Sequence, residues 1–167
     1  ETVRLRCADR ADCRMSDARF EDASPPPLRL RAFESSDLQV LSALVQDAVF
    51  PASEMKYSKR KRRFAMLINR FRWEEKSDAR VERVQSVLSI EDVQKVQTQG
   101  PEMRSPDTIL SLLALEFEPS EDGSGRITLT LAGDGAIALD VEALEVTLSD
   151  VTRAYAAKTG ARPSHPD

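Results

Sequence analysis

Short runs in which apolar and polar residues alternate are the feature that most constrains the fold of this chain. In the second half, apolar side chains recur with a period of two near residues 109–117, 127–131, 137–141 and 144–148. This period places alternate side chains on opposite faces of a strand, so each run predicts a half-buried β-strand. Gly133-Asp134-Gly135 separates two of the runs, and Asp-Gly favours a tight hairpin turn. The second half is therefore predicted to be an antiparallel meander.

The first half adds one helix behind its first strand. Residues 28–32 alternate as a strand does. Ser36 and Gln39 have the spacing of a capping box, in which each side chain satisfies a backbone N–H of the other residue. Apolar residues follow at helical spacing, so we expect a helix over residues 37–46.

A basic hairpin is expected next. Residues 54–57 and 64–73 predict two strands, and Lys59–Arg63 is the expected tip between them. Apolar residues occur on both faces of the second strand, which is typical of a central strand. Alternation resumes at residues 84–90.

These patterns predict an α+β fold with a mainly antiparallel, strongly curved sheet or half-closed barrel of about eight strands. One helix follows the first strand. A second, C-terminal helix is expected from Ser149 to Lys158, because Ser149 can cap it and Gly160 can end it. The alternation also predicts one core, made of Phe64, Met66, Leu67, Ile68, Leu113, Leu115, Phe117, Leu129, Leu131, Ile137 and Leu139.

The ends of the chain have no apolar period. Residues 1–24 are expected to be a disordered tail and residues 25–27 a proline spacer, because the few apolar groups there cannot offset the entropy of ordering. We expect a single domain over residues 28–158 and a second disordered tail at 159–167. Met15 opens a polar leader, so residues 1–14 are expected to lie upstream of the natural start. No export signal or membrane-spanning run is present, which favours the cytoplasm.

The residue types that most catalytic or metal sites require are scarce. The single histidine, His165, lies two residues from the C-terminus, so no imidazole is available inside the fold for a triad or a metal site. Cys7 and Cys13 lie in the N-terminal tail, and their spacing is not that of a zinc site. Gly133 and Gly135 lack the third glycine and the helix of a dinucleotide loop. We therefore expect no cofactor and no metal.

Paired carboxylates are the remaining route to acid–base chemistry. Glu116 and Glu118 lie two apart on a predicted strand, as do Asp140 and Glu142, so each pair shares a face. Both faces are opposite the apolar rows, and we expect them to be solvated. A general acid or base would need a raised pKa inside a pocket.

The distribution of charge is strongly uneven. Residues 56–72 carry a charge of +8 and contain no acid, whereas the rest of the chain carries −12. Adjacent cations repel one another unless they are solvated or bound to a polyanion. Arg70 and Arg72 share a strand face with Phe64, so their head groups must reach solvent or meet acids, for which the Glu74-Glu75 turn is a candidate. The candidate binding residues are Lys59, Arg60, Lys61, Arg62, Arg63, Arg70, Arg72 and Trp73.

Three segments resemble the signature of a small alphaproteobacterial family catalogued as a domain of unknown function. They are Arg62–Glu74 (RRFAMLINRFRWE), Leu112–Pro119 (LLALEFEP) and Leu131–Ile137 (LAGDGAI), the last followed by Leu139–Glu142 (LDVE). Lys61 and Ala143 depart from the family pattern, which has an acidic residue and a cysteine there. The resemblance implies domain boundaries and a bacterial cytoplasmic protein, and it implies no chemistry.

The sequence therefore favours a non-enzymatic binding or accessory module that meets an acidic protein through the basic hairpin. Nucleic acid or an anionic ligand bound by the same patch is one alternative, since arginines mixed with an aromatic side chain suit phosphates and base stacking. An enzyme of unfamiliar carboxylate type is the other. No membrane partner is expected.

Overall fold

The strands predicted from alternation pair into one sheet. The structure is a computed structural model that describes residues 27–73, 82–100, 105–152 and 155–156. The expected tails at 1–24 and 159–167, with Met15 and both cysteines, lie outside the described residues. Within the described residues the sheet has eleven strands. They are β1 (Arg29–Ala32), β2 (Ala48–Pro51), β3 (Met55–Ser58), β4 (Arg63–Phe71), β5 (Glu82–Ile90), β6 (Val93–Gln99), β7 (Ile109–Pro119), β8 (Gly125–Leu131), β9 (Ala136–Val141), β10 (Val146–Asp150) and β11 (Tyr155–Ala156).

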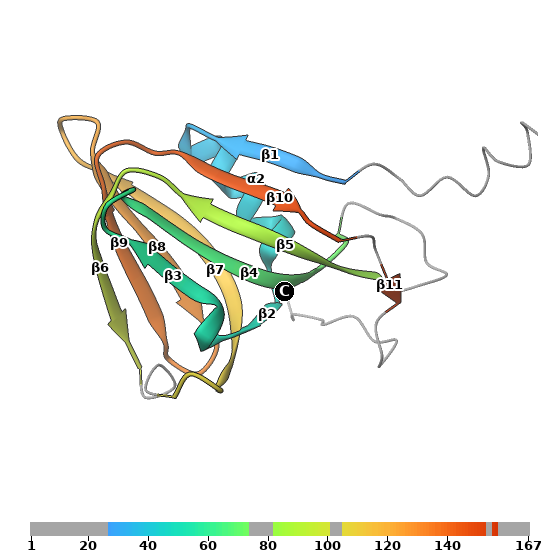
Figure 1. The fold of residues 1–167 in the computed structure, drawn as a ribbon. Coiled ribbons are helices and arrows are strands. Elements are labelled where there is room, and N and C mark those ends of the chain that lie inside the picture. Colours follow the sequence, from blue (N-terminus) through green and yellow to red (C-terminus); the bar gives the residue numbers. More distant parts are fainter. Residues whose placement is uncertain (1–26, 74–81, 101–104, 153–154, 157–167) are drawn as a thin grey trace, which may run out of the picture.

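All strand pairs of the described sheet are antiparallel. The strand order is β1-β10-β5-β4-β2-β7-β8-β9-β6, with β3 added to β4 and β11 added to β5 (Figure 1). The end strands β1 and β6 do not pair with each other, so the sheet is not closed. A mainly antiparallel sheet with a helix after its first strand is thus confirmed.

Helix α2 (Ser35–Val45) lies against β7 and β1, which are far apart in the strand order. Leu38, Leu41 and Val45 are spaced three and four residues apart, which places them on one helix face, and all three are buried. A short 3-10 helix, η1 (Ala52–Glu54), links β2 to β3. No helix among the described residues is long and apolar enough to cross a membrane.

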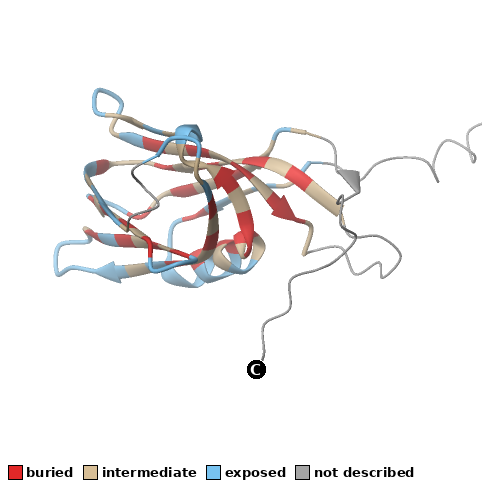
Figure 2. Cartoon of the chain, turned by 90° about the horizontal axis from the view of Figure 1, so that it is seen from below, coloured by how far each residue is buried: buried red, intermediate tan, exposed pale blue. Residues whose placement is uncertain are grey.

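One core joins the two ends of the sheet. Buried side chains alternate along the strands, as the red bands in Figure 2 show. The core cluster includes Met66 and Leu88 from one part of the sheet and Leu129 and Leu139 from the other. Because residues on both sides of β2 contact the same cluster, the inner faces of these strands all point towards one interior.

The β7 strand corrects part of the predicted core. Its pairing with β8 shifts by one residue between Leu112 and Ala114, which indicates a β-bulge. The extra residue changes which positions face the core. Leu110 and Leu112 are buried before the bulge, and Leu115 is buried after it. Leu113 is only half-buried, and Phe117, like Leu67 on β4, is also of intermediate exposure.

The predicted C-terminal helix is wrong over the residues that the structure describes. Ser149 and Asp150 belong to β10, and Tyr155–Ala156 form β11, which pairs with β5. Between them the Val151 N–H donates to Gln85 O at 2.8 Å. Backbone groups that a helix would have hydrogen-bonded internally are thus hydrogen-bonded to β5 instead.

The predicted capping box is also wrong. Helix α2 begins at Ser35 with Glu34 at the N-cap position, and no side chain caps it. The helix ends at Val45, close to the expected boundary.

Candidate binding surface

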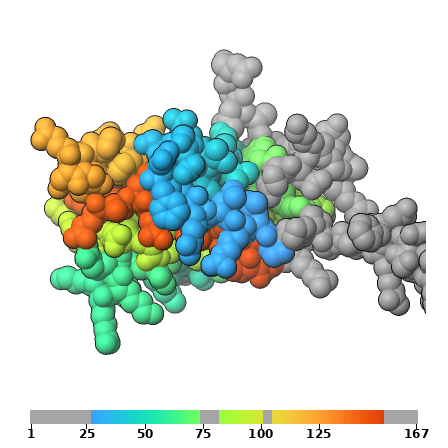
Figure 3. Space-filling model, turned by 90° about the horizontal axis from the view of Figure 1, so that it is seen from above, coloured from blue at the N-terminus to red at the C-terminus, as the bar shows by residue number. Residues whose placement is uncertain are grey.

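The turn between β3 and β4 presents the basic tip expected from the sequence. Ser58 pairs with Arg63, so residues 59–62 form the turn. Lys59, Arg60 and Lys61 are exposed. In the space-filling view of Figure 3, the green region around residue 60 projects from the body of the molecule. We refer to Lys59, Arg60 and Lys61 as the tip cations.

The next two arginines of the basic run are held by acids. Arg62 Nη2 lies 2.5 Å from Glu142 Oε2, and Arg63 Nε lies 2.7 Å from Glu91 Oε1. Gln94 Nε2 also donates to Glu142, at 2.7 Å. The hydrogen bonds from Arg62 and then Gln94 lower the pKa of Glu142 below its ordinary value of 4.5. The five-residue run is therefore divided into three tip cations and two paired arginines.

Backbone contacts fix the base of this turn. Arg62 adopts a left-handed conformation with φ of 54°, and its carbonyl accepts a 2.8 Å hydrogen bond from Val93 N. Tyr57 Oη donates to Val93 O at 2.9 Å. These bonds join the hairpin to the corner between β5 and β6, where Asp92 also has a positive φ, of 55°. The corner contacts position the tip relative to the rest of the sheet, and the alternation of residues along the chain does not predict them.

Arg70 does not belong to a solvent-facing patch. Its side chain has no exposed surface, and its guanidinium pairs with Asp150 on β10 at 2.9 Å. Arg72 pairs with Glu82 at the start of β5. The expectation that these arginines meet acids is fulfilled, and the two acids that the structure describes, Asp150 and Glu82, lie on other strands. The candidate turn at Glu74-Glu75 lies outside the described residues.

Trp73 lies at the opposite end of β4 from the tip cations. The nine residues of β4 span about 26 Å at roughly 3.3 Å per residue. Trp73 Nε1 donates to Gln46 O at 3.0 Å, and its ring lies 5.5 Å from the Phe71 ring. Trp73 and the tip cations are therefore not brought together on one surface.

The carboxylate pairs predicted from spacing lie on the surface. Glu116 and Glu118 are both exposed on β7. Asp140 accepts a 2.8 Å hydrogen bond from Arg126 Nε, and Glu142 is held by Arg62. The part of the chain that the structure describes holds no cluster of three or more His, Cys, Asp or Glu suited to a metal ion.

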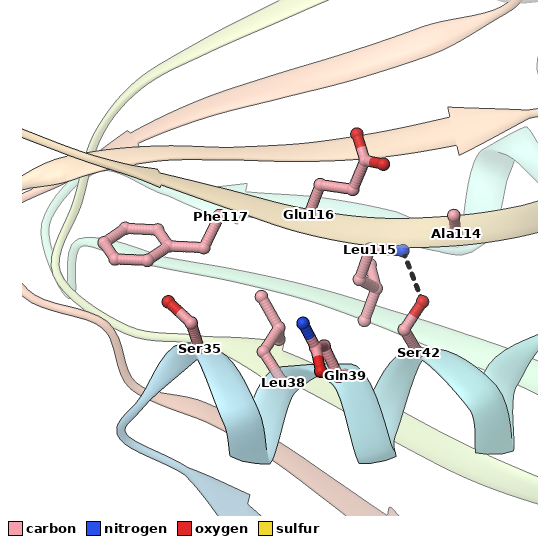
Figure 4. A pocket seen from close by; sticks show the side chains of 8 residues that line it. All are labelled: Ser35, Leu38, Gln39, Ser42, Ala114, Leu115, Glu116 and Phe117. Carbon is pink, nitrogen blue, oxygen red and sulfur yellow. Dashed lines mark hydrogen bonds between the residues drawn. The ribbon is translucent and has the colours of Figure 1, made fainter.

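Sequence reasoning missed a groove of about 350 Å³ between α2 and β7 (Figure 4). Leu38 and Leu115 point towards each other across it, and Ser42 Oγ accepts a 2.9 Å hydrogen bond from Leu115 N. The carboxylate of Glu116 points away from the helix. Because no ionisable side chain points into this groove, it offers no acid–base pair. Its lining residues are Ser35, Leu38, Gln39, Ser42, Ala114, Leu115, Glu116 and Phe117.

A second, shallower hollow lies on the outer side of α2. Its volume is about 470 Å³, and Trp73 forms one wall. Val40, which also lines it, is 57% exposed. Trp73 therefore lies beside the outer side of α2, away from the tip cations.

The described surface presents exposed cations on a fixed turn, and the carboxylates considered above face solvent or pair with arginines. The chain belongs to the family described as "Protein of unknown function (DUF2948)", whose model matches residues 28–165. No curated protein and no solved structure matches the chain. The matched region starts at Leu28, the first residue of the predicted domain.

Proposed function

We propose that this protein is a non-enzymatic binding module that meets an acidic protein partner through the tip cations. One observation carries the proposal. Lys59, Arg60 and Lys61 are exposed and form no ion pair with any described residue, whereas Arg62 and Arg63 beside them are each paired with a glutamate. The paired arginines hold the turn, and three cations are left for a partner.

The surroundings of the tip favour an acidic protein over nucleic acid. Glu91 and Glu142 flank the tip and would repel a continuous phosphate backbone, as would the charge of −12 on the rest of the chain. Trp73, the aromatic side chain proposed to stack on bases, packs at the far end of β4. A protein partner with a local group of carboxylates can instead contact the tip alone. We place this interaction in the bacterial cytoplasm, in line with the resemblance noted above.

The enzyme alternative is less well supported by the same geometry. General acid–base catalysis needs a carboxyl whose pKa is raised in a pocket. Glu116 and Glu118 are exposed, and Asp140 is paired with Arg126. The pKa of Glu142 is lowered, not raised, by its hydrogen bonds from Arg62 and Gln94.

The test uses two polyanions as probes: a polyglutamate peptide of about 20 residues and a DNA duplex of matched charge. We expect polyglutamate to bind at about 50 mM salt and to weaken as salt screens the contact. The variant Arg60→Ser/Lys61→Ser should raise the dissociation constant for polyglutamate about three- to tenfold. The matched control Arg29→Ser/Arg31→Ser removes two exposed arginines from β1 and should have a much smaller effect.

Two outcomes would overturn the proposal. If both double variants weaken polyglutamate binding equally, this binding depends on the net charge of the protein and not on the tip cations. If duplex DNA binds more tightly than polyglutamate and the tip variant abolishes that binding, the partner is a nucleic acid. Absence of binding of either probe at about 50 mM salt would also reject it, since electrostatic association is strongest at low salt.

A further inference from the structure

The strand β6 ends the sheet with one unpaired edge. Among the described strands it pairs only with β9. Five of its seven residues are exposed, including three in a row, Gln97, Thr98 and Gln99. An edge strand of this length exposes N–H and C=O groups that can pair with another chain.

The hydrogen-bond pattern identifies the backbone groups that face outward. Leu131 N donates to Gly135 O, so this pair of the β8–β9 ladder is hydrogen-bonded. Because hydrogen-bonded pairs alternate along an antiparallel ladder, the backbone groups of Ala136, Ala138 and Asp140 point to β6. Their partners on β6 are Gln99, Gln97 and Lys95. The backbone groups of Val96 and Thr98 therefore point away from β9.

The other end of the sheet is unsuited to such pairing. β1 has only four residues and carries Arg29 and Arg31, both exposed. Antiparallel pairing of two copies of β1 centred on Leu30 would place Arg29 opposite Arg31, and like charges directly opposite are destabilising. Charged residues on a short strand are a common protection of a sheet edge. β6 has a single charge, Lys95, and no acid or proline.

We propose that two copies of this chain associate through β6, paired antiparallel about a two-fold axis at Val96. In this register all seven residues of β6 overlap, and Val96 lies opposite Val96 of the second copy. Lys95 lies opposite Gln97 of the second copy, so no like charges oppose each other. A shift that placed Val96 opposite Gln94 would instead oppose the two copies of Lys95. Full overlap of the two strands, together with the separation of the two Lys95 residues, thus favours this register.

The contact is limited in size, which sets the expected strength. Val93 N and O already bond to Arg62 and Tyr57, so new backbone bonds form only beyond Val93. A single strand pair falls below the area of a standard stable interface. We therefore expect a concentration-dependent equilibrium. It would join two sheets and display two basic tips, and it stands whether or not the tip binds a partner.

Sedimentation velocity from about 10 µM to about 1 mM tests the proposal with two substitutions at one exposed position. Gln97→Glu places a carboxylate opposite Lys95 of the second copy, twice per dimer, and should lower the dissociation constant about three- to tenfold. Gln97→Lys places like charges there and should raise it by a similar factor. The same pair of substitutions at Gln99, which lies opposite Val93, is the matched control and should change it much less.

Amide hydrogen exchange gives an independent reading. Val96 and Thr98 should become protected as the concentration rises, while Gln97, already bonded to β9, should not change. The proposal is overturned if the wild type stays monomeric to about 1 mM, or if Gln97→Glu and Gln97→Lys shift association in the same direction. Unfolding midpoints of all four variants show whether each change acts on the interface or on the fold.

Discussion

Arg70 on β4 and Asp150 on β10 form a bidentate ion pair inside the sheet. Arg70 Nη2 lies 2.9 Å from each carboxylate oxygen, and the two side chains are 0% and 6% exposed. Ser86 Oγ donates to the same carboxylate at 2.6 Å, and Leu28 N donates at 2.9 Å. The carboxylate thus links β4, β5 and β10 to the segment that leads into β1. A buried pair is stable only when its remaining hydrogen-bonding capacity is satisfied in this way.

Removing one partner of this pair should destabilise the fold strongly. Asp150→Ala removes the bidentate carboxylate from the buried Arg70 guanidinium, at an expected cost of about 3–5 kcal/mol. The double variant Arg70→Met/Asp150→Leu removes both charges and should cost clearly less, because a buried pair of similar volume can be replaced by apolar side chains. Urea unfolding monitored by circular dichroism measures both values. Equal destabilisation by the single and double variants would contradict this account.

The face of Arg70 was predictable, but its partner was not. Alternation along residues 64–73 places Arg70 on the side of Phe64 and Met66, and a buried arginine needs an acid. The sequence indicated the nearby Glu74-Glu75 turn, which lies outside the described residues, and did not indicate Asp150, 80 positions away. A period of two gives the face of a strand and says nothing about which strands become neighbours. The same gap misassigned Ser149, Asp150 and Tyr155–Ala156, because these residues pair with β5.

The β-bulge in β7 makes a prediction that distinguishes two neighbouring leucines. Leu115→Ala should destabilise the protein by about 2–5 kcal/mol, because Leu115 is 3% exposed and its truncation leaves a cavity in the core. Leu113→Ala should cost much less, since Leu113 is only half-buried after the register shift. Thermal or urea unfolding of the two variants provides the comparison. If Leu113→Ala were the more damaging, the bulge would be misplaced.

Sequence periodicity could not locate this bulge. Residues 109–117 contain leucines at both even and odd positions, so the pattern does not show which of them face the core. The β2 strand fixes the first phase by pairing with Ile109–Leu112, and β8 fixes the second beyond Ala114. The basic tip, in contrast, was predictable because turn position and charge are both local properties. Its anchors at Tyr57, Glu91 and Glu142 depend on tertiary contacts.

Gly125 at the start of β8 has no room for a side chain. A Cβ there would lie 2.4 Å from Glu118 O and 2.5 Å from the Phe117 ring. We expect Gly125→Ala to destabilise the fold, and Gly125→Ala/Phe117→Leu to recover only part of the loss because the backbone oxygen remains. Gly123→Ala in the preceding turn meets no atom within 4 Å, although its φ of 83° makes alanine strained. A Gly125→Ala variant with the wild-type unfolding midpoint would show that the β7–β8 hairpin can shift.

The tip cations should be replaceable without loss of stability. Arg60→Ser/Lys61→Ser changes two exposed side chains that form no ion pair with described residues, so we expect a change of no more than about 0.5 kcal/mol. This result would also show that any loss of polyglutamate binding by the same variant is due to the missing charges. Urea unfolding measures the change. If this variant no longer unfolds cooperatively, the tip cations are required for the fold.

The Arg62–Glu142 pair makes the hairpin contact dependent on pH in a defined direction. The pKa of Glu142 is lowered in the folded protein, first by Arg62 and then by Gln94, from an ordinary value of 4.5. Its contribution to stability is therefore present above about pH 4.5 and is lost as the pH falls through the lower, folded pKa. A carbon-13 NMR titration of Glu142 should give a midpoint below 4.5 in the wild type. In Arg62→Gln the midpoint should rise towards 4.5 without fully reaching it, because Gln94 still donates at 2.7 Å. An unchanged midpoint in that variant would mean that Arg62 does not hold the carboxylate in solution, and the fixed orientation of the tip would then depend on the Arg63–Glu91 pair and on the contacts of Tyr57 and Val93.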